Sequence, residues 1–336
     1  MKKVIALLLA LVMLLAMSAC GETKPAESQE PEQSEVPVEE AYQFTAPIEI
    51  VVPQKAGEIS DLSARILAKY LTEEIGQSVV VTNLPGSGGS TAAHMVDDAE
   101  ANGDTLLYIE ESTLTNALAG TLDMSWRDFE LISYFGSSNS FIWATSKDSG
   151  ITDVESLKKY YEDNGPIPAG VTVGNPSHFY AVAIEQATGI EFKPIDAGSG
   201  ADKLIALLSG QLVSFPSSYA AVADYLKTGE VCTAGCIGPE RSPVMPDVPT
   251  FNEQGADLGL GFDKFFILGA TKGTPSEKIA AIDKAVAAVM SNPDCIAEME
   301  ANGYTADYKD AAGAAAYLQE KEAYLQPIAD IINGTK

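Results

Sequence analysis

The chain has 336 residues, of which 46% are hydrophobic, and a formal net charge of −26. Residues 1–20 carry +2 and residues 21–40 carry −6, which leaves −22 on the remainder. Such an acidic body excludes nucleic acid and anionic lipid as partners of the folded part. An anionic ligand has to be captured locally, against the field of the whole protein.

The first twenty residues have the order of a lipoprotein signal peptide. Two lysines precede an apolar stretch over 4–15, which suits a signal and is short for a membrane-spanning helix. Two small residues then precede Cys20, as in the bacterial lipobox, whose cysteine is lipidated and becomes the mature N-terminus. An ordinary secretory signal cleaved elsewhere is the alternative. Both predict an extracytoplasmic protein, and the first predicts a lipid anchor that holds Cys20 at the cell membrane.

Residues 21–41 are predicted to be a disordered acidic linker. Seven glutamates and three prolines occur over 21–40, without an aromatic residue, so the segment cannot bury enough apolar surface to fold. As a coil it spans about 25 Å. The folded part begins at Tyr42 and is long enough for two domains.

Strands and helices alternate through the first part of the body. Strands are expected at 48–52, 79–83 and 105–109, and helices at 60–75 and 91–101. This β-α-β-α-β order predicts a parallel, doubly wound sheet.

The pattern starts again further along the chain. Further strands are expected at 130–135, 140–145, 170–174, 212–215, 230–235 and 265–270. Further helices are expected at 153–163 (capped by Thr152), 179–188, 201–209, 219–227, 276–291, 293–302 and 310–332. We therefore expect two α/β lobes forming a clamshell, with lobe 1 made from 42–143 and 242–336 and lobe 2 from 144–241. The chain crosses near 142–147 and 236–245, and ligands bind beyond the carboxyl ends of such strands, so both sheets share one cleft.

Loops rich in glycine and hydroxyl residues follow the predicted strands. They present backbone N–H groups and helix N-termini, which suit a small anionic ligand, although any one of them also fits an ordinary turn. The loops are 53–61, 83–90, 110–116, 174–179, 196–203 and 214–219.

Catalysis and metal binding have little support in the sequence. Ser87 lies in PGSGG, which lacks the first glycine of a nucleophile elbow, and His94 falls inside a predicted helix. No histidine spacing fits a metal site, so we expect no cofactor and no metal. Cys232, Cys236 and Cys295 are expected to be small buried side chains rather than disulfide partners.

Taken together, the loops resemble the substrate-binding receptors of tripartite tricarboxylate transporters, the Bug family. The resemblance runs from about residue 47 to the C-terminus. Its carriers are IVVP at 50–53, SDLSAR at 60–65, GQSVVVTNLPGSGG at 76–89, NGDTLLYI at 102–109, GNPSH at 174–178, GADKLIALLSGQL at 200–212, RSPVMPDVPTFNEQG at 241–255 and FFILGATKGTP at 265–275.

The resemblance implies a type II periplasmic-binding-protein fold, each lobe a mainly parallel sheet flanked by helices. It implies a monomeric receptor, not an enzyme, that takes a small carboxylate or amino-acid-like ligand to separate membrane permease subunits. It also implies that backbone amides, hydroxyls and waters hold the ligand carboxylate. The ligand-binding positions it points to are Ala56, Gly57, Asp61, Ser87, Gly88, Ser112, Thr113, Asn175, Ser177, His178, Gly198 and Ser217.

Three departures from the family pattern change the rim of the expected cleft. Glu58 and Ile59 replace glycine positions, Leu84 stands where an arginine is usual, and Ile195-Asp196 replaces Tyr-Lys. An acidic rim repels a polycarboxylate. We therefore expect a monocarboxylate, or a zwitterion whose amino group meets Glu58 or Asp196, rather than citrate. The alternatives are a ligand sensor that docks on a signalling protein, and a lipoprotein serine hydrolase.

Overall fold

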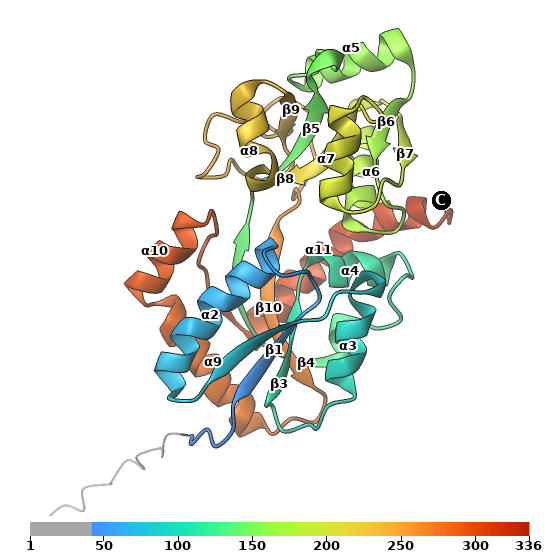
Figure 1. Ribbon diagram of the computed structural model, residues 1–336. Helices are drawn as coiled ribbons and strands as arrows, with labels where there is room; N and C mark the ends of the chain where they lie inside the picture. Colours follow the sequence, from blue (N-terminus) through green and yellow to red (C-terminus); the bar gives the residue numbers. More distant parts are fainter. Residues whose placement is uncertain (1–41, 336) are drawn as a thin grey trace, which may run out of the picture. The chain divides into compact units, whose positions relative to one another are not determined.

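Two separate β-sheets organise residues 42–335, the part of the chain that the computed structural model describes (Figure 1). The predicted signal, Cys20 and nearly all of the acidic linker lie outside the described residues. Helices flank both sheets, which confirms the two-lobed α/β fold. Both sheets are mixed rather than mainly parallel. The lobe boundaries given above stay a prediction.

The first sheet has parallel strands on one side and antiparallel strands on the other. β1 pairs in parallel with β2 and β3, whereas β10 runs antiparallel to its neighbours β3 and β4. β10 joins this sheet after the chain has passed through the second sheet. The strand order is β11 (Lys309–Asp310), β4 (Phe129–Ser138), β10 (Lys264–Thr271), β3 (Thr105–Ile109), β1 (Ile48–Val52) and β2 (Val79–Asn83).

The second sheet is mixed in the same way. β6 pairs in parallel with β7 and β8, and β5 runs antiparallel to β8 and β9. The strand order is β7 (Phe192–Ile195), β6 (Ile167–Gly170), β8 (Ser214–Ser218), β5 (Phe141–Ser146) and β9 (Val231–Cys236).

Apolar side chains fill both faces of the first sheet. In β1 the side chains of Ile48, Ile50 and Val52 pack towards α2 and α9, and Val51 packs into a second core with α3, α4 and α11. This second core continues to α5 and α6, while α7 and α8 cover part of the second sheet. No helix among the described residues has the length and apolar content needed to cross a membrane. The helices are α2 (Ile59–Ile75), α3 (Ser90–Asp97), α4 (Glu111–Leu118), α5 (Val154–Asn164), α6 (Pro176–Thr188), α7 (Gly200–Leu208), α8 (Tyr219–Thr228), α9 (Ser276–Met290), α10 (Pro293–Ala301) and α11 (Ala311–Ile332).

Several local predictions were wrong. The segment 110–116 is not a loop, because α4 begins at Glu111 and buries its polar side chains. The strand expected at 170–174 is β6, which ends at Gly170, and Val173 is exposed. β7 was missed because it contains a proline, which an edge strand tolerates. The N-cap of α5 is Asp153, whose carboxylate accepts the Ser156 N–H, rather than Thr152.

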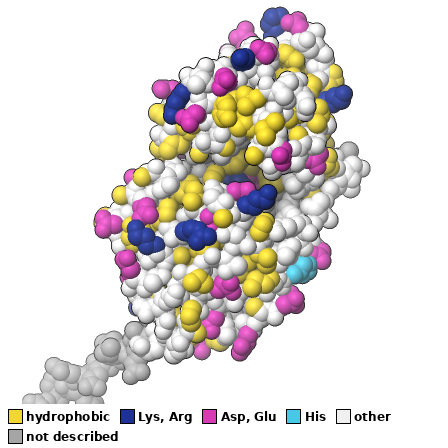
Figure 2. Space-filling view, in the orientation of Figure 1, with side chains coloured by type: hydrophobic (Ala, Val, Ile, Leu, Met, Phe, Trp, Pro, Cys, Tyr) yellow, Lys and Arg dark blue, Asp and Glu magenta, His cyan; other side chains and the backbone are white. Residues whose placement is uncertain are grey.

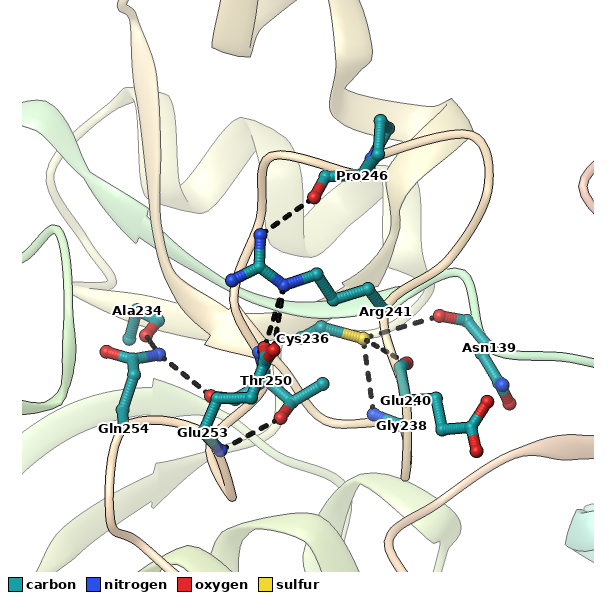
Figure 3. Close-up of polar contacts among 10 residues, drawn as sticks. All are labelled: Asn139, Ala234, Cys236, Gly238, Glu240, Arg241, Pro246, Thr250, Glu253 and Gln254. Atoms are coloured by element: carbon teal, nitrogen blue, oxygen red, sulfur yellow. Dashed lines mark hydrogen bonds and ion pairs between the residues drawn. The ribbon is translucent and has the colours of Figure 1, made fainter.

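The chain crosses between the sheets earlier than predicted, at 139–140, since 141–146 already belongs to β5. It returns through 237–263. Buried Cys236 lies where the two crossings meet, because its thiol donates to Asn139 O at 3.4 Å and its sulfur accepts the Gly238 N–H at 3.4 Å (Figure 3). Cys236 and Cys295 are free and buried, as expected, and Cys232 is partly exposed.

Ion pairing shapes the returning segment. The Arg241 side chain pairs with Glu253 at 2.9 Å and donates to Pro246 O at 2.8 Å (Figure 3). The Glu253 carboxylate also accepts the Thr250 N–H. The RSPVMPDVPT motif therefore folds onto itself and serves a structural role between the sheets.

Candidate functional site

The loop between β1 and α2 is held by a buried carboxylate. Asp61, 2% exposed, accepts the Gly57 N–H at 2.8 Å and pairs with Arg65 at 2.8 Å. Burial acts to raise the pKa of Asp61, but the hydrogen bonds from Arg65 and Gly57 outweigh it and lower that pKa. Asp61 therefore orders the loop and leaves ligand contacts to its neighbours.

The loop after β2 folds into a short 3-10 turn, Ser87–Gly89, before α3. Gly88 has φ +65°, and a Cβ there would lie 2.7 Å from the Asn116 amide nitrogen, which donates to Gly88 O. Glycine is required because the positive φ and the close approach both exclude a side chain. Ser87 also has a positive φ of 46°. Strained backbone of this kind is concentrated at functional sites.

The end of β3 places a buried carboxylate beneath these loops. Glu110, 0% exposed, accepts hydrogen bonds from Gln54, Ser60 and Ser112. Burial acts to raise its pKa, but nearby Lys264 and the three donors outweigh burial and lower it. Glu110 therefore carries a negative charge that compensates Lys264.

The second sheet contributes the loop before α6. The Ser177 hydroxyl accepts the Thr172 N–H at 3.1 Å, and His178 Nδ1 accepts the Gly174 N–H at 3.3 Å. Burial lowers the pKa of His178, which favours the neutral ring that such an acceptor requires. His178 shapes the loop, whereas Asn175 and Ser177 line the adjacent pocket.

The glycine-serine loop before α7 is closed by its own acidic residues. Ser199 and Asp202 form a capping box, and Asp196 accepts the Gly198 N–H at 3.1 Å and the Thr172 hydroxyl at 3.2 Å. Lys203 follows on the first turn of the helix. Its ammonium donates to the Thr172 hydroxyl at 3.1 Å, and its side chain is only 8% exposed.

Two adjoining pockets lie among these loops, in the hollow seen at the middle of Figure 2. The smaller, called the polar pocket, has a volume of about 500 Å³, and the larger pocket about 940 Å³. Both draw residues from the two sheets and their helices. They share a wall, called the shared wall, formed by Gln54, Lys55, Glu58, Phe141, Ser199, Gly200, Pro216 and Lys264.

Most of the predicted positions line one of the pockets. Gly57 and Ser217 line the larger pocket. The polar pocket is lined by Ser87, Gly88, Ser112, Asn175, Ser177 and Gly198.

Four predicted positions line neither pocket: Ala56, Asp61, Thr113 and His178. Asp61 and His178 accept backbone N–H groups in their own loops, and Thr113 belongs to the capping box of α4.

Of the two rim acids, Glu58 lines both pockets, and Asp196 lines neither because its carboxylate is used within its loop. His94, considered above for a hydrolase, lies away from both pockets and bonds to Asp123 at 2.9 Å.

Sequence reasoning missed the three lysines that line the polar pocket, Lys55, Lys203 and Lys264, of which the last two are buried. Lys264 begins β10 and lies over the ring of Phe141, with 5.4 Å from Nζ to the centroid. Burial lowers the pKa of Lys203, and Asp196 raises it less. Burial also acts to lower the pKa of Lys264, but Glu110, Glu111 and Glu58 raise it overall. Among residues 42–335, neither ammonium forms an ion pair with a carboxylate. These lysines occur singly and in distant segments, so no motif indicated that they lie at one pocket.

Comparisons with known proteins agree with this geometry. Residues 63–333 match the model of the tripartite tricarboxylate transporter family receptor. Among curated proteins, the UPF0065 protein in the gbd 5' region of Cupriavidus necator is 27% identical over 286 residues, covering 82% of this chain and 85% of the relative. Protein BugT of Bordetella pertussis is 24% identical over 273 residues, covering 77% of this chain and 81% of BugT.

Solved structures share the fold. Malate-bound MatC from Rhodopseudomonas palustris has a TM-score of 0.71 at 23% identity, covering 85% of this chain and all of MatC. Rpa4515 of R. palustris with adipate has a TM-score of 0.76 at 22% identity, covering 86% of this chain and 98% of that protein. The periplasmic binding protein BugD has a TM-score of 0.72 at 22% identity, covering 86% and 98%. With two sheets, a lined cleft and a family match over most of its length, the chain belongs to the tripartite tricarboxylate transporter receptor family, the Bug solute-binding proteins.

Proposed function

We propose that this protein is an extracytoplasmic receptor that captures a small carboxylate and delivers it to a tripartite tricarboxylate-type membrane permease. The observation that carries the proposal is the buried Lys203, which lines the polar pocket and forms no ion pair with a carboxylate among residues 42–335; Lys264, whose charge Glu110 compensates, lines the same pocket. Burying an ammonium without an anionic partner is costly, and a ligand carboxylate supplies that partner. The bound malate and adipate of MatC and Rpa4515 support the same chemistry.

The proposed binding site combines the two lysines with the loop positions of both lobes. Ser87 and Gly88 offer amides and a hydroxyl from the first sheet, where the Ser112 hydroxyl already donates to Glu110, and Asn175, Ser177 and Gly198 offer polar groups from the second. Contacts from both sides would stabilise a closed form, with bending at the two crossings. Glu58 adds a negative charge to the shared wall, which favours a monocarboxylate or a zwitterion over citrate.

Calorimetric titration with succinate, citrate, simple monocarboxylates and amino acids tests the capture step. Lys203→Met and Lys264→Met should weaken carboxylate binding by about tenfold or more each. Lys227→Met is the matched control, because it removes the same charge from an exposed lysine paired with Asp224, outside both pockets. If no carboxylate binds, or if all three variants weaken binding equally, carboxylate capture at this site is wrong.

Delivery to a permease and anchoring through Cys20 need separate experiments. Carboxylate uptake into vesicles that contain the permease subunits should require the receptor. Binding without any effect on uptake would favour the sensor role instead.

A further inference from the structure

We infer that the ligand is a monocarboxylate with an apolar body, which places its carboxylate in the polar pocket and its body in the larger pocket. The inference rests on the proposed function of carboxylate capture and adds the class of ligand. The two pockets meet at the shared wall, where Lys264 lines both of them. A ligand whose carboxylate is held at Lys264 can therefore extend its body into the larger pocket while that contact is kept.

Charge is distributed unevenly between the pockets. Lys203 lines only the polar pocket, and the remaining charged side chains, Lys55, Glu58 and Lys264, belong to the shared wall. Beyond that wall, no residue lining the larger pocket carries a charge. A second carboxylate placed there would lose water without gaining a cationic partner, which is costly. This distribution disfavours a dicarboxylate whose ends are far apart.

Three buried hydroxyl groups of the larger pocket already have partners within the protein. Ser60 donates to Glu110, Ser217 donates to Ser218 O at 3.2 Å, and Ser140 is within 3.3 Å of Gly303 O. All three serines are at most 6% exposed. These three hydroxyls have donated their hydrogens within the protein and can offer a ligand only acceptor lone pairs, which leaves them without a donor for a ligand oxygen.

Apolar side chains supply the accessible surface of the larger pocket from both lobes. Leu62 of α2 is 39% exposed there, and Leu204 of α7 is partly exposed. Ala201, Ala220 and Ala221 are exposed on the same pocket. Covering this surface with an apolar ligand body is favourable, and about 940 Å³ accommodates a body of several carbons.

A homologous ligand series separates this inference from the proposed function. Calorimetric titration of the full chain with acetate, butyrate, hexanoate and octanoate should show affinity rising about fourfold for each methylene that is buried. Adipate and gluconate have the chain length of hexanoate but add a carboxylate or hydroxyls. Each should bind about tenfold or more weakly than hexanoate.

Variants of α7 locate the effect in the larger pocket. Leu204→Ser should weaken octanoate binding by about tenfold and leave acetate binding unchanged. Ala201→Gln should also weaken octanoate binding and leave acetate binding unchanged, because the longer side chain occupies the pocket. Ala201 is exposed, so this substitution should not disturb folding. Leu208→Ser is the matched control, because Leu208 is 44% exposed on the same helix and lines neither pocket.

Each outcome bears on a different claim. Binding of carboxylates with affinities that do not change along the series, or tighter binding of adipate than hexanoate, would overturn the apolar body while leaving carboxylate capture intact. Failure of every carboxylate to bind would overturn the proposed function itself.

Discussion

Replacing Glu111 by glutamine should make the stability of the protein less sensitive to a rise in pH from the acidic to the neutral range. Glu111 begins α4 and is 2% exposed, and its carboxylate accepts a hydrogen bond from the Tyr180 hydroxyl of α6. Burial raises its pKa to about 7, against the lowering effects of Lys264, the Tyr180 hydrogen bond and Lys321. Asp263, which is paired with Lys321 at 2.5 Å, raises the pKa further.

The size and sign of the effect follow from proton linkage. Between the reference pKa of 4.5 and the folded value of about 7, the folded protein binds more protons at Glu111 than the unfolded chain does. The free energy of unfolding therefore falls as pH rises through this range. At about 1.4 kcal/mol for each pKa unit, the total loss is about 3 kcal/mol and is complete somewhat above the folded pKa.

Denaturant unfolding of the ligand-free wild type and Glu111→Gln, from about pH 4.5 to about pH 8.5, measures this difference. Glutamine keeps a carbonyl acceptor for Tyr180 and cannot ionise. From the low to the high end of this range, the free energy of unfolding of the variant should rise by about 3 kcal/mol relative to that of wild type. The contributions of the other titrating groups cancel in the difference between the two proteins. Tyr180→Phe should shift the wild-type decline to higher pH, since it removes a bond that favours the carboxylate. A difference that stays constant with pH would refute this account of Glu111.

Four further predictions concern the loops, the lysines and the anchor. Lys203→Met should raise the free energy of unfolding of the ligand-free protein while weakening carboxylate binding, and a loss of both would show that the ammonium has a structural role. Gly88→Ala should lower the free energy of unfolding by about 1–2 kcal/mol in denaturant titrations because of its φ of +65° and the nearby Asn116 amide, whereas unchanged stability would contradict that geometry. Raising the ionic strength from about 10 mM to about 150 mM should increase the association rate of a carboxylate in stopped-flow measurements, since salt screens repulsion by the net charge; a decrease would assign steering to the local lysines. Cys20→Ser should move the protein from the membrane fraction to the soluble extracytoplasmic fraction, and continued membrane retention would argue against lipid anchoring.

Runs of branched apolar residues correctly predicted the strands whose side chains are buried. The range 48–52 coincides with β1, because isoleucine and valine fill cores on both of its faces. α4 was missed for the opposite reason. Its buried residues include Ser112, Thr115 and Asn116, so no apolar stripe marks the helix. The Glu110–Thr113 capping box is the one local signal that was present.

The glycine-rich part of the site was predictable, and its charged part was not. Glycine and serine after a strand indicate a tight loop wherever they occur, and five of the predicted glycine and serine positions line the polar pocket. Lys203 and Lys264 occur singly, and only the packing of α7 and β10 brings them to the same pocket. A charge acquires its functional meaning from what surrounds it, and that depends on contacts between distant segments.

The arrangement of charge is the reason why so acidic a protein could bind an anion, as we propose. At physiological ionic strength the field of distant charges decays over about 8 Å, so the net charge acts weakly inside the cleft. Contact distance and burial decide the interaction there, and Lys203, together with Lys264 whose charge Glu110 partly offsets, supplies positive charge where it is least screened. One lysine comes from each lobe, so a carboxylate that contacts both gains its full stabilisation only when the lobes approach. A ligand without a carboxylate would not gain this additional stabilisation in the closed form, and would therefore bind without driving closure.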